Sequence, residues 1–320
     1  MKTEKIFMLD AKALKKALAI ELAGYGYEKG EIHNKNKFLY AEGDAPYMLV
    51  AHLDTVHRQS PSIICYSQDG NYIMSPQGIG GDDRCGVYII LSLLKKLPFK
   101  PHVVFTMEEE IGGHGASAFI GYLDNKQMCP ELKYIVEFDR KGDKDCVFYH
   151  CDNNEFVEFV EGFGFEKAHG TFTDISIIAP SLGVAAVNLS SGYYNPHTEH
   201  EYVSMKDMND IINASYNMLC AESQTFEYIE EQTYVYSYYG AKTSVSFLPK
   251  DTVYVVSRYT NKQYVNDNVE IAIDKNGNYY RYDAVYGEIE RLYYEDVVPI
   301  NDDYEPVYDE ANALLIKRYY

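Results

Sequence analysis

The chain has 320 residues, of which 46% are hydrophobic and 24% charged, values of an ordinary globular protein that argue against wholesale disorder. The formal net charge of −19 argues against nucleic-acid binding and against docking on anionic lipid, because both depend on Lys and Arg. We expect no membrane partner and, since neither a long apolar run nor a signal peptide is found, a cytoplasmic protein. The six cysteines form no CxxC pair, as expected for reduced thiols.

Residues 1–220 show alternating strand and helix patterns. In chain order, the sequence predicts a helix at 10–23 with Asp10 as N-cap, a strand at 47–51, a helix through 87–94, a strand at 102–106, a helix at 114–122, a strand at 134–138, apolar runs at 175–178 and 184–189, and a helix at 205–220 capped by Ser204. This alternation favours an α/β fold with a mostly parallel or mixed central sheet and helices on both faces.

The last hundred residues differ in composition and period. Eighteen of the 32 tyrosines fall within residues 221–320. Strand-like runs occur at 252–259, 269–273 and 278–282, and Asn276-Gly277 between the last two predicts a hairpin turn. We therefore expect a domain boundary near residue 222, with an α/β domain at 1–222 and a small, Tyr-rich, mainly β module of unknown role at 223–320.

The polar residues of interest lie in five short segments. The first, residues 51–56, ends a predicted strand, so His52 and Asp54 point to the same side. A carboxylate beside an imidazole is the usual arrangement around a metal-binding His, although an HxD pair alone has little specificity.

The second segment, residues 78–86, has two adjacent acids, Asp82 and Asp83, after a glycine-rich turn. A phosphate-binding loop is excluded, because there is no GK[ST] and Asp83 stands where GxGxxG needs its third glycine. Two carboxylates suit a divalent cation, and the alternative is a helix N-terminus whose dipole favours acidic residues.

The remaining segments each follow or end a predicted strand, or precede a capped helix. They contain the acids Glu108, Glu109 and Glu110, then Asp139, then two histidines at 197 and 200. Each alone is readily explained as a solvated loop. Taken together, hard oxygen donors with two imidazoles suit two divalent ions, zinc first, with manganese or cobalt as alternatives.

The order of these motifs resembles the co-catalytic dizinc exopeptidases, which include the peptidase T, glutamyl aminopeptidase and carboxypeptidase G types. The resemblance covers roughly residues 45–210 and rests on HLDTV (52–56), GDDRCG (81–86), EEEIGG (108–113), FDR (138–140) and NPHTEHEYVSMKDM (195–208).

The resemblance implies a role for each matching residue. His52 and Asp139 would bind one metal, Glu110 and His197 the second, and Asp82 both. The same comparison implies that Asp54 orients His52, that Glu109 is the general base, and that the peptide bond ahead of Asp83 is cis. His197 is preferred to His200 because Glu201 follows it by four residues, as in the tripeptidase type.

Charge arithmetic supports this assignment. Two divalent ions exceed the charge of the three carboxylates that would bind them by one unit, which favours ionisation of a bridging water, and metal binding can lower the pKa of water to about 7. Glu109, not being a ligand, is then free to take the proton and pass it to the leaving amine. The expected reaction is hydrolysis of a terminal amide bond.

Only 58 residues separate Asp139 from His197, which leaves no room for the lid domain of the tripeptidase and carboxypeptidase types and favours a lidless aminopeptidase type. Groups that a lid would supply must come from elsewhere, with Tyr193, Tyr194 and His200 as candidates. Thr173-Asp174 resembles a pocket-shaping motif of lidless relatives.

An acidic rim of Glu108, Asp83 and Glu201 would suit the free α-ammonium of a short peptide, whereas Arg84 and Arg140 count against it. We therefore expect an aminopeptidase. The alternatives are an N-acyl amino acid deacylase using the same metals and a non-catalytic metal-binding interaction protein. A homo-oligomer stays open.

Overall fold

The structure, a computed structural model, describes residues 1–230 and, after them, the backbone of eight short strands between Tyr234 and Leu292. By packing, the chain separates into two units, Met1–Glu230 and Glu231–Tyr320. The helices of the first unit are α1 (Thr3–Met8), α2 (Ala11–Gly24), α3 (Gly81–Lys96), α4 (His114–Lys126), α5 (Asn154–Glu161), α6 (Ile175–Leu182) and α7 (Met205–Cys220).

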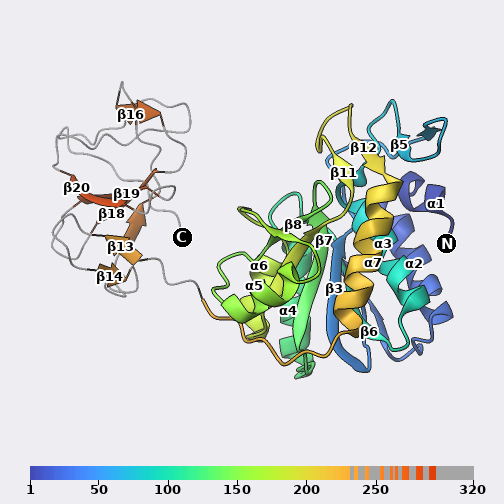
Figure 1. Ribbon diagram of the computed structural model, residues 1–320, viewed down its shortest axis with the longest axis horizontal. Helices are drawn as coiled ribbons and strands as arrows, with labels where there is room; N and C mark the ends of the chain where they lie inside the picture. Colours follow the sequence, from blue (N-terminus) through green and yellow to red (C-terminus); the bar gives the residue numbers. More distant parts are fainter. Residues whose placement is uncertain are drawn as a thin grey trace. The chain divides into compact units, whose positions relative to one another are not determined.

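The first unit is built on an eight-stranded sheet with the order β1-β2-β6-β3-β7-β10-β8-β9. These strands are β1 (Ile32–Asn34), β2 (Phe38–Ala41), β3 (Ala45–His52), β6 (Pro101–Thr106), β7 (Tyr134–Arg140), β8 (Asp145–Val147), β9 (Glu166–Lys167) and β10 (Ala186–Ser190). The four central strands, β6, β3, β7 and β10, run parallel (Figure 1). The predicted α/β class with a mostly parallel sheet is therefore confirmed.

Helices cover both faces of this sheet. On one face, Leu49 and Ala51 of β3 belong to a core shared with α1, α2, α3, α5 and α7, while Met48 and Val50 face a second core with α4 and α6. A strand that is buried on both sides needs apolar residues at every position, which explains the unbroken run Tyr47–Ala51.

The predicted helix starts are present in the structure. The side chain of Asp10 accepts a hydrogen bond from the amide of Ala13, and that of Ser204 accepts one from Asp207. Helix α4 runs four residues beyond its predicted end at residue 122. The apolar run at 175–178 begins helix α6, and the run at 184–189 leads into β10.

The stretch between Asp139 and His197 belongs to the main fold, because it supplies β8, α5, β9, α6 and β10. Residues 223–230 also pack on the first unit. The Phe226 ring lies 5.0 Å from that of Phe156 and 5.3 Å from that of Phe159, measured between centroids.

A second, four-stranded sheet has the order β11-β12-β5-β4. It contains β4 (Cys65–Tyr66), β5 (Tyr72–Met74), β11 (Tyr193–Tyr194) and β12 (Tyr202–Ser204). The loop between β11 and β12 carries His197, so this small sheet anchors a predicted metal ligand.

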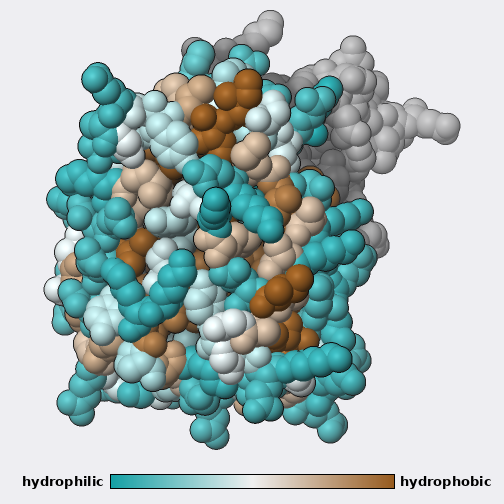
Figure 2. Space-filling view, turned by 90° about the vertical axis from the view of Figure 1, so that its right-hand side faces the viewer, coloured by the Kyte–Doolittle hydropathy of each residue, from teal (hydrophilic) through white to brown (hydrophobic). Residues whose placement is uncertain are grey.

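Most side chains on the face of the molecule seen in Figure 2 are hydrophilic, in keeping with the charged composition. None of the helices that the structure describes is both long and apolar enough to span a bilayer.

The second unit contains a six-stranded sheet with the order β14-β13-β20-β19-β18-β15 and a separate β16–β17 pair. Its strands are β13 (Tyr234–Tyr236), β14 (Lys242–Ser244), β15 (Val253–Val255), β16 (Thr260–Asn261), β17 (Tyr264–Val265), β18 (Val269–Ile273), β19 (Tyr279–Asp283) and β20 (Glu288–Leu292). Strands β18 and β19 pair antiparallel, as predicted, whereas the turn at Asn276-Gly277 lies outside the described residues.

Helix α3 lies unusually close to β7 at Gly86. A Cβ atom at this position would lie 2.3 Å from the carbonyl oxygen of Phe138 and 2.4 Å from Oδ2 of Asp83. Both distances are far below van der Waals contact, so α3 can pack here only because residue 86 has no side chain.

We predict that Gly86→Ala lowers the free energy of unfolding by about 1–3 kcal/mol, because the added methyl group overpacks a buried contact. Gly121→Ala in α4 is the matched control. A Cβ atom at Gly121 meets nothing within 4 Å, so this change should stabilise the helix by about 0.5–1 kcal/mol. Urea unfolding of both variants measures the difference, and equal effects would contradict the packing argument.

Candidate metal centre

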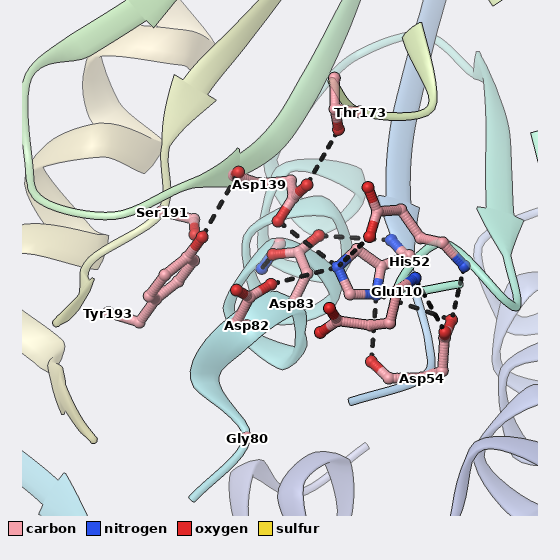
Figure 3. Close-up of polar contacts among 12 residues, drawn as sticks. His52, Asp54, Gly80, Asp82, Asp83, Glu110, Asp139, Thr173, Ser191 and Tyr193 are labelled. Atoms are coloured by element: carbon pink, nitrogen blue, oxygen red, sulfur yellow. Dashed lines mark hydrogen bonds and ion pairs between the residues drawn. The ribbon is translucent and has the colours of Figure 1, made fainter. Parts of the chain in front are cut away.

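The predicted site residues converge at the carboxyl ends of the central strands, where open α/β sheets place their ligand sites. His52 ends β3, Glu109 and Glu110 follow β6, and Asp139 is the second-to-last residue of β7. Asp82 comes from the first turn of α3, and Figure 3 shows it directed toward His52 together with Asp139.

The carboxylate of Asp82 lies between two imidazoles. Its Oδ1 is 3.1 Å from Nε2 of His52, and its Oδ2 is 3.2 Å from Nε2 of His197. Nε2 of His52 is also 3.5 Å from Oδ1 of Asp139, and Nε2 of His197 is 3.4 Å from Oε2 of Glu110. Each imidazole therefore faces one carboxylate of its own and shares Asp82 with the other.

These residues fit divalent metal ions. Ligand atoms of His52, Asp82 and Glu110 all lie within 4.8 Å of one another. Oε1 of Glu110 is buried without a hydrogen-bond partner, which is costly unless a ligand completes its contacts. Oxygen and imidazole donors in this combination are those that zinc, manganese and cobalt accept. The peptide bond between Asp82 and Asp83 is cis, as the resemblance implies.

Asp54 supports both neighbouring elements. Its carboxylate accepts hydrogen bonds from the amides of Glu109 (3.4 Å) and Glu110 (3.3 Å). Nδ1 of His52 lies 3.0 Å from the carbonyl oxygen of Asp54 and 3.7 Å from its Oδ1. Because a carbonyl oxygen only accepts, Nδ1 carries a hydrogen and Nε2 is the ring nitrogen turned toward the other acids.

Glu201 and His57 hold the loop that presents Asp82. The buried carboxylate of Glu201 accepts hydrogen bonds from the amides of Gly80 (2.9 Å) and Asp82 (3.0 Å), and it lies 3.0 Å from Nε2 of His57. No spacing pattern in the sequence marks His57, so its role could not be predicted. The supporting role of Glu201 was signalled by its place four residues after His197.

A second missed residue, Glu137, lies behind Asp139. Oγ1 of Thr173 is 2.8 Å from Oε2 of Glu137 and 2.9 Å from Oδ2 of Asp139. The hydroxyl group of Thr173 thus lies within hydrogen-bond distance of two carboxyl groups. Burial raises the pKa of Glu137 well above its usual value. The signal in the sequence was an acid inside an apolar strand, two residues before Asp139 and therefore on the same side of the strand.

Burial also changes the acids of the centre. Removal from water raises the pKa values of Glu109, Glu110 and Asp139 to about 7 each. Glu109 stands slightly apart, with Oε2 4.0 Å from Nε2 of His52. A carboxyl group with a pKa near neutrality, close to the ligands but not among the closest contacts, has the properties of a general base.

The predicted acidic rim is wrong for two of its three members. Asp83 is fully buried and accepts hydrogen bonds from the amides of His52 and Gly86, and Glu201 is 1% exposed. Glu108 is half-buried and pairs with Lys37 at 2.7 Å. Asp83 and Glu201 are turned inward, where their carboxylates satisfy buried backbone amides.

The candidates for a group replacing a lid are mostly directed elsewhere. The hydroxyl of Tyr194 donates to Asp207 at 2.7 Å, and His200 is exposed in its loop. Only Tyr193 contacts the centre, since its hydroxyl donates to the backbone carbonyl of Asp139 at 3.4 Å. Arg84, expected to oppose an aminopeptidase, is buried and donates to carbonyl groups at the end of α1.

Comparison with known proteins finds no matching family model and no matching curated protein. Solved structures do match. Aminopeptidase PepT from Bacillus cereus has a TM-score of 0.53 at 14% identity over 68% of this chain and 96% of its own. A tripeptidase from Staphylococcus aureus has a TM-score of 0.53 at 13% identity over 68% of this chain and 95% of its own. The dodecamer PhTET1-12s has a TM-score of 0.50 at 14% identity over 69% of this chain and 98% of its own. At such identities the likeness concerns the fold.

We predict that the metal-free protein becomes less stable as pH rises from 5 to 8. The pKa values of Glu109, Glu110 and Asp139, raised to about 7, exceed those of the unfolded chain, so the folded state binds more protons in this window and loses stability as they leave. The pKa of His197, raised to about 9, chiefly by its hydrogen bond to Asp82, acts in the same direction.

Thermal unfolding in the presence of a chelator should show a melting temperature that falls by several degrees between pH 5 and pH 8, and zinc should reverse the fall. Glu110→Gln removes one titrating group and should flatten the slope. A melting temperature that rises over this range would contradict the assignment.

Proposed function

We propose that this protein is a metal-dependent aminopeptidase that hydrolyses the terminal amide bond of short peptides. The observation that carries the proposal is the carboxylate of Asp82, with one oxygen facing each of two imidazoles beside the uncommitted acid Glu109. That arrangement suits two adjacent cations and a base, which are the parts that a two-metal mechanism of amide hydrolysis uses.

Two divalent ions, zinc in the first place, would be held by His52 and Asp139 on one side, by Glu110 and His197 on the other, and by Asp82 between them. When bound, such ions polarise the scissile carbonyl group and lower the pKa of a water molecule. Asp54 fixes the ring of His52 so that Nε2 faces Asp82 and Asp139, with which it would hold one ion.

Glu109 then acts on protons. Its carboxylate takes the proton of the attacking water and gives it to the amine that leaves, so the group ends the cycle in the state in which it began. Burial raises the pKa of Glu109 above its usual value in the metal-free protein, which favours uptake of a proton by this carboxylate.

Cleavage at the amino end, rather than removal of an acyl group, is supported by the fold, since solved proteins that share it are named aminopeptidase and tripeptidase. Asp83 and Glu201 are buried, so they do not contribute negative charge to a rim that would bind the free α-ammonium of a peptide. We also propose that residues 1–222 form the catalytic domain and that the protein is cytoplasmic. A homo-oligomer is a further proposal, for which the dodecamer PhTET1-12s gives a precedent.

We predict that the zinc-loaded full chain hydrolyses aminoacyl anilides and dipeptides, and that Glu109→Gln lowers kcat by about 10²–10⁴ because the positioned base is lost. The variant should bind as much metal as the wild type, since Glu109 is not a ligand. Chromogenic rates and metal content of the same samples test both statements.

Acetylated amino acids are the discriminating control. Hydrolysis of these compounds alone would replace the aminopeptidase with a deacylase. Unchanged rates in Glu109→Gln would remove the proposed base, and metal binding without hydrolysis of either substrate class would support a non-catalytic metal-binding protein.

A further inference from the structure

Two exposed apolar side chains are next in the sequence to residues of the candidate centre. Ile111 is 66% exposed and directly follows Glu110. Phe172 is 43% exposed and directly precedes Thr173, whose Oγ1 lies 2.9 Å from Oδ2 of Asp139. The two side chains thus come from loops that meet the centre from different strands.

Phe172 reaches from its own loop to the loop that carries Glu109. A Cβ atom at Gly113 would lie 2.8 Å from Cζ of Phe172, so the ring tip rests on the bare backbone at this glycine. Gly113 is tied to the centre, because its amide donates to the carbonyl oxygen of Glu109 at 3.1 Å. The contact fixes the ring within one short turn of the proposed base.

Charged groups beside these side chains are already paired. Glu108 contacts Lys37 at 2.7 Å and His114 at 3.1 Å. Arg140 pairs with Asp145 at 3.4 Å and donates to the carbonyl oxygen of His169 at 2.6 Å. An acidic or basic substrate side chain here would have to compete with these partners, whereas an apolar one gains by covering apolar surface.

We propose that Ile111 and Phe172 bind the apolar side chain of the amino-terminal residue of the substrate. This inference rests on the proposed function and adds the substrate class, namely short peptides that begin with a residue such as leucine or phenylalanine. The side chain of the cleaved residue lies on the two apolar groups while its carbonyl group faces the centre.

Amino acid hydroxamates test the proposal by binding, without turnover, because the hydroxamate group anchors on metal and leaves the side chain to report its surroundings. Calorimetry of the zinc-loaded full chain should show leucine hydroxamate binding about tenfold more tightly than glycine hydroxamate, and more tightly than glutamate hydroxamate. In Ile111→Ser the preference over glycine should fall to about threefold or less, with binding of glycine hydroxamate unchanged.

Ile20→Ser is the matched control, because Ile20 is 77% exposed on α2 and takes no part in the centre. Its leucine preference should equal that of the wild type. Phe172→Ala should also lower the preference for leucine hydroxamate. Because Phe172 packs on Gly113 as well, this variant changes two contacts, and Ile111→Ser is the cleaner test.

The outcomes separate the two proposals. Equal affinity for leucine and glycine hydroxamates, or tighter binding of glutamate hydroxamate, overturns the apolar site. A leucine preference that depends on Ile111, in a protein that cleaves no aminoacyl substrate, supports the apolar site and overturns the aminopeptidase.

Discussion

The constraint on which the structure depends is the gathering of several carboxylates in one nearly buried space. Asp82, Glu110 and Asp139 each lie within 3.5 Å of an imidazole of His52 or His197. Charges removed from water and placed beside like charges are costly unless they are compensated. Burial accordingly raises the pKa values of Glu110 and Asp139 to about 7. Divalent cations are the compensation that this donor set accepts most readily.

The rest of the fold serves to assemble and hold these groups. Parallel strands bring their carboxyl ends to one edge of the sheet, and β3, β6 and β7 each supply part of the centre there. A surrounding layer then fixes the ligands. Glu201 holds the backbone at Asp82, Asp54 holds the backbone at Glu109 and Glu110, and Thr173 connects Asp139 to a buried acid.

The candidate ligands were proposed from the order of motifs that resembles a known family. Of the five, only His52 and Asp139 lie at strand ends that apolar runs predict. The same patterns predicted the α/β class and the helix caps at Asp10 and Ser204. Two residues of the surrounding layer, His57 and Glu137, escaped prediction, because contacts between distant segments fix their roles. The spacing from His197 marked Glu201 as a residue of interest, but it did not show that the carboxylate reaches back to the amide of Gly80.

The central claim is that side chains from five separate segments together bind two divalent cations. The most direct test is a calorimetric titration with zinc. The full chain is first treated with a chelator, which is then removed. The account predicts two zinc ions per chain, and loss of at least one of them in Asp82→Asn, since that carboxylate faces both imidazoles. A wild-type protein that binds no zinc, or an Asp82→Asn variant that binds both ions as tightly as the wild type, would contradict it.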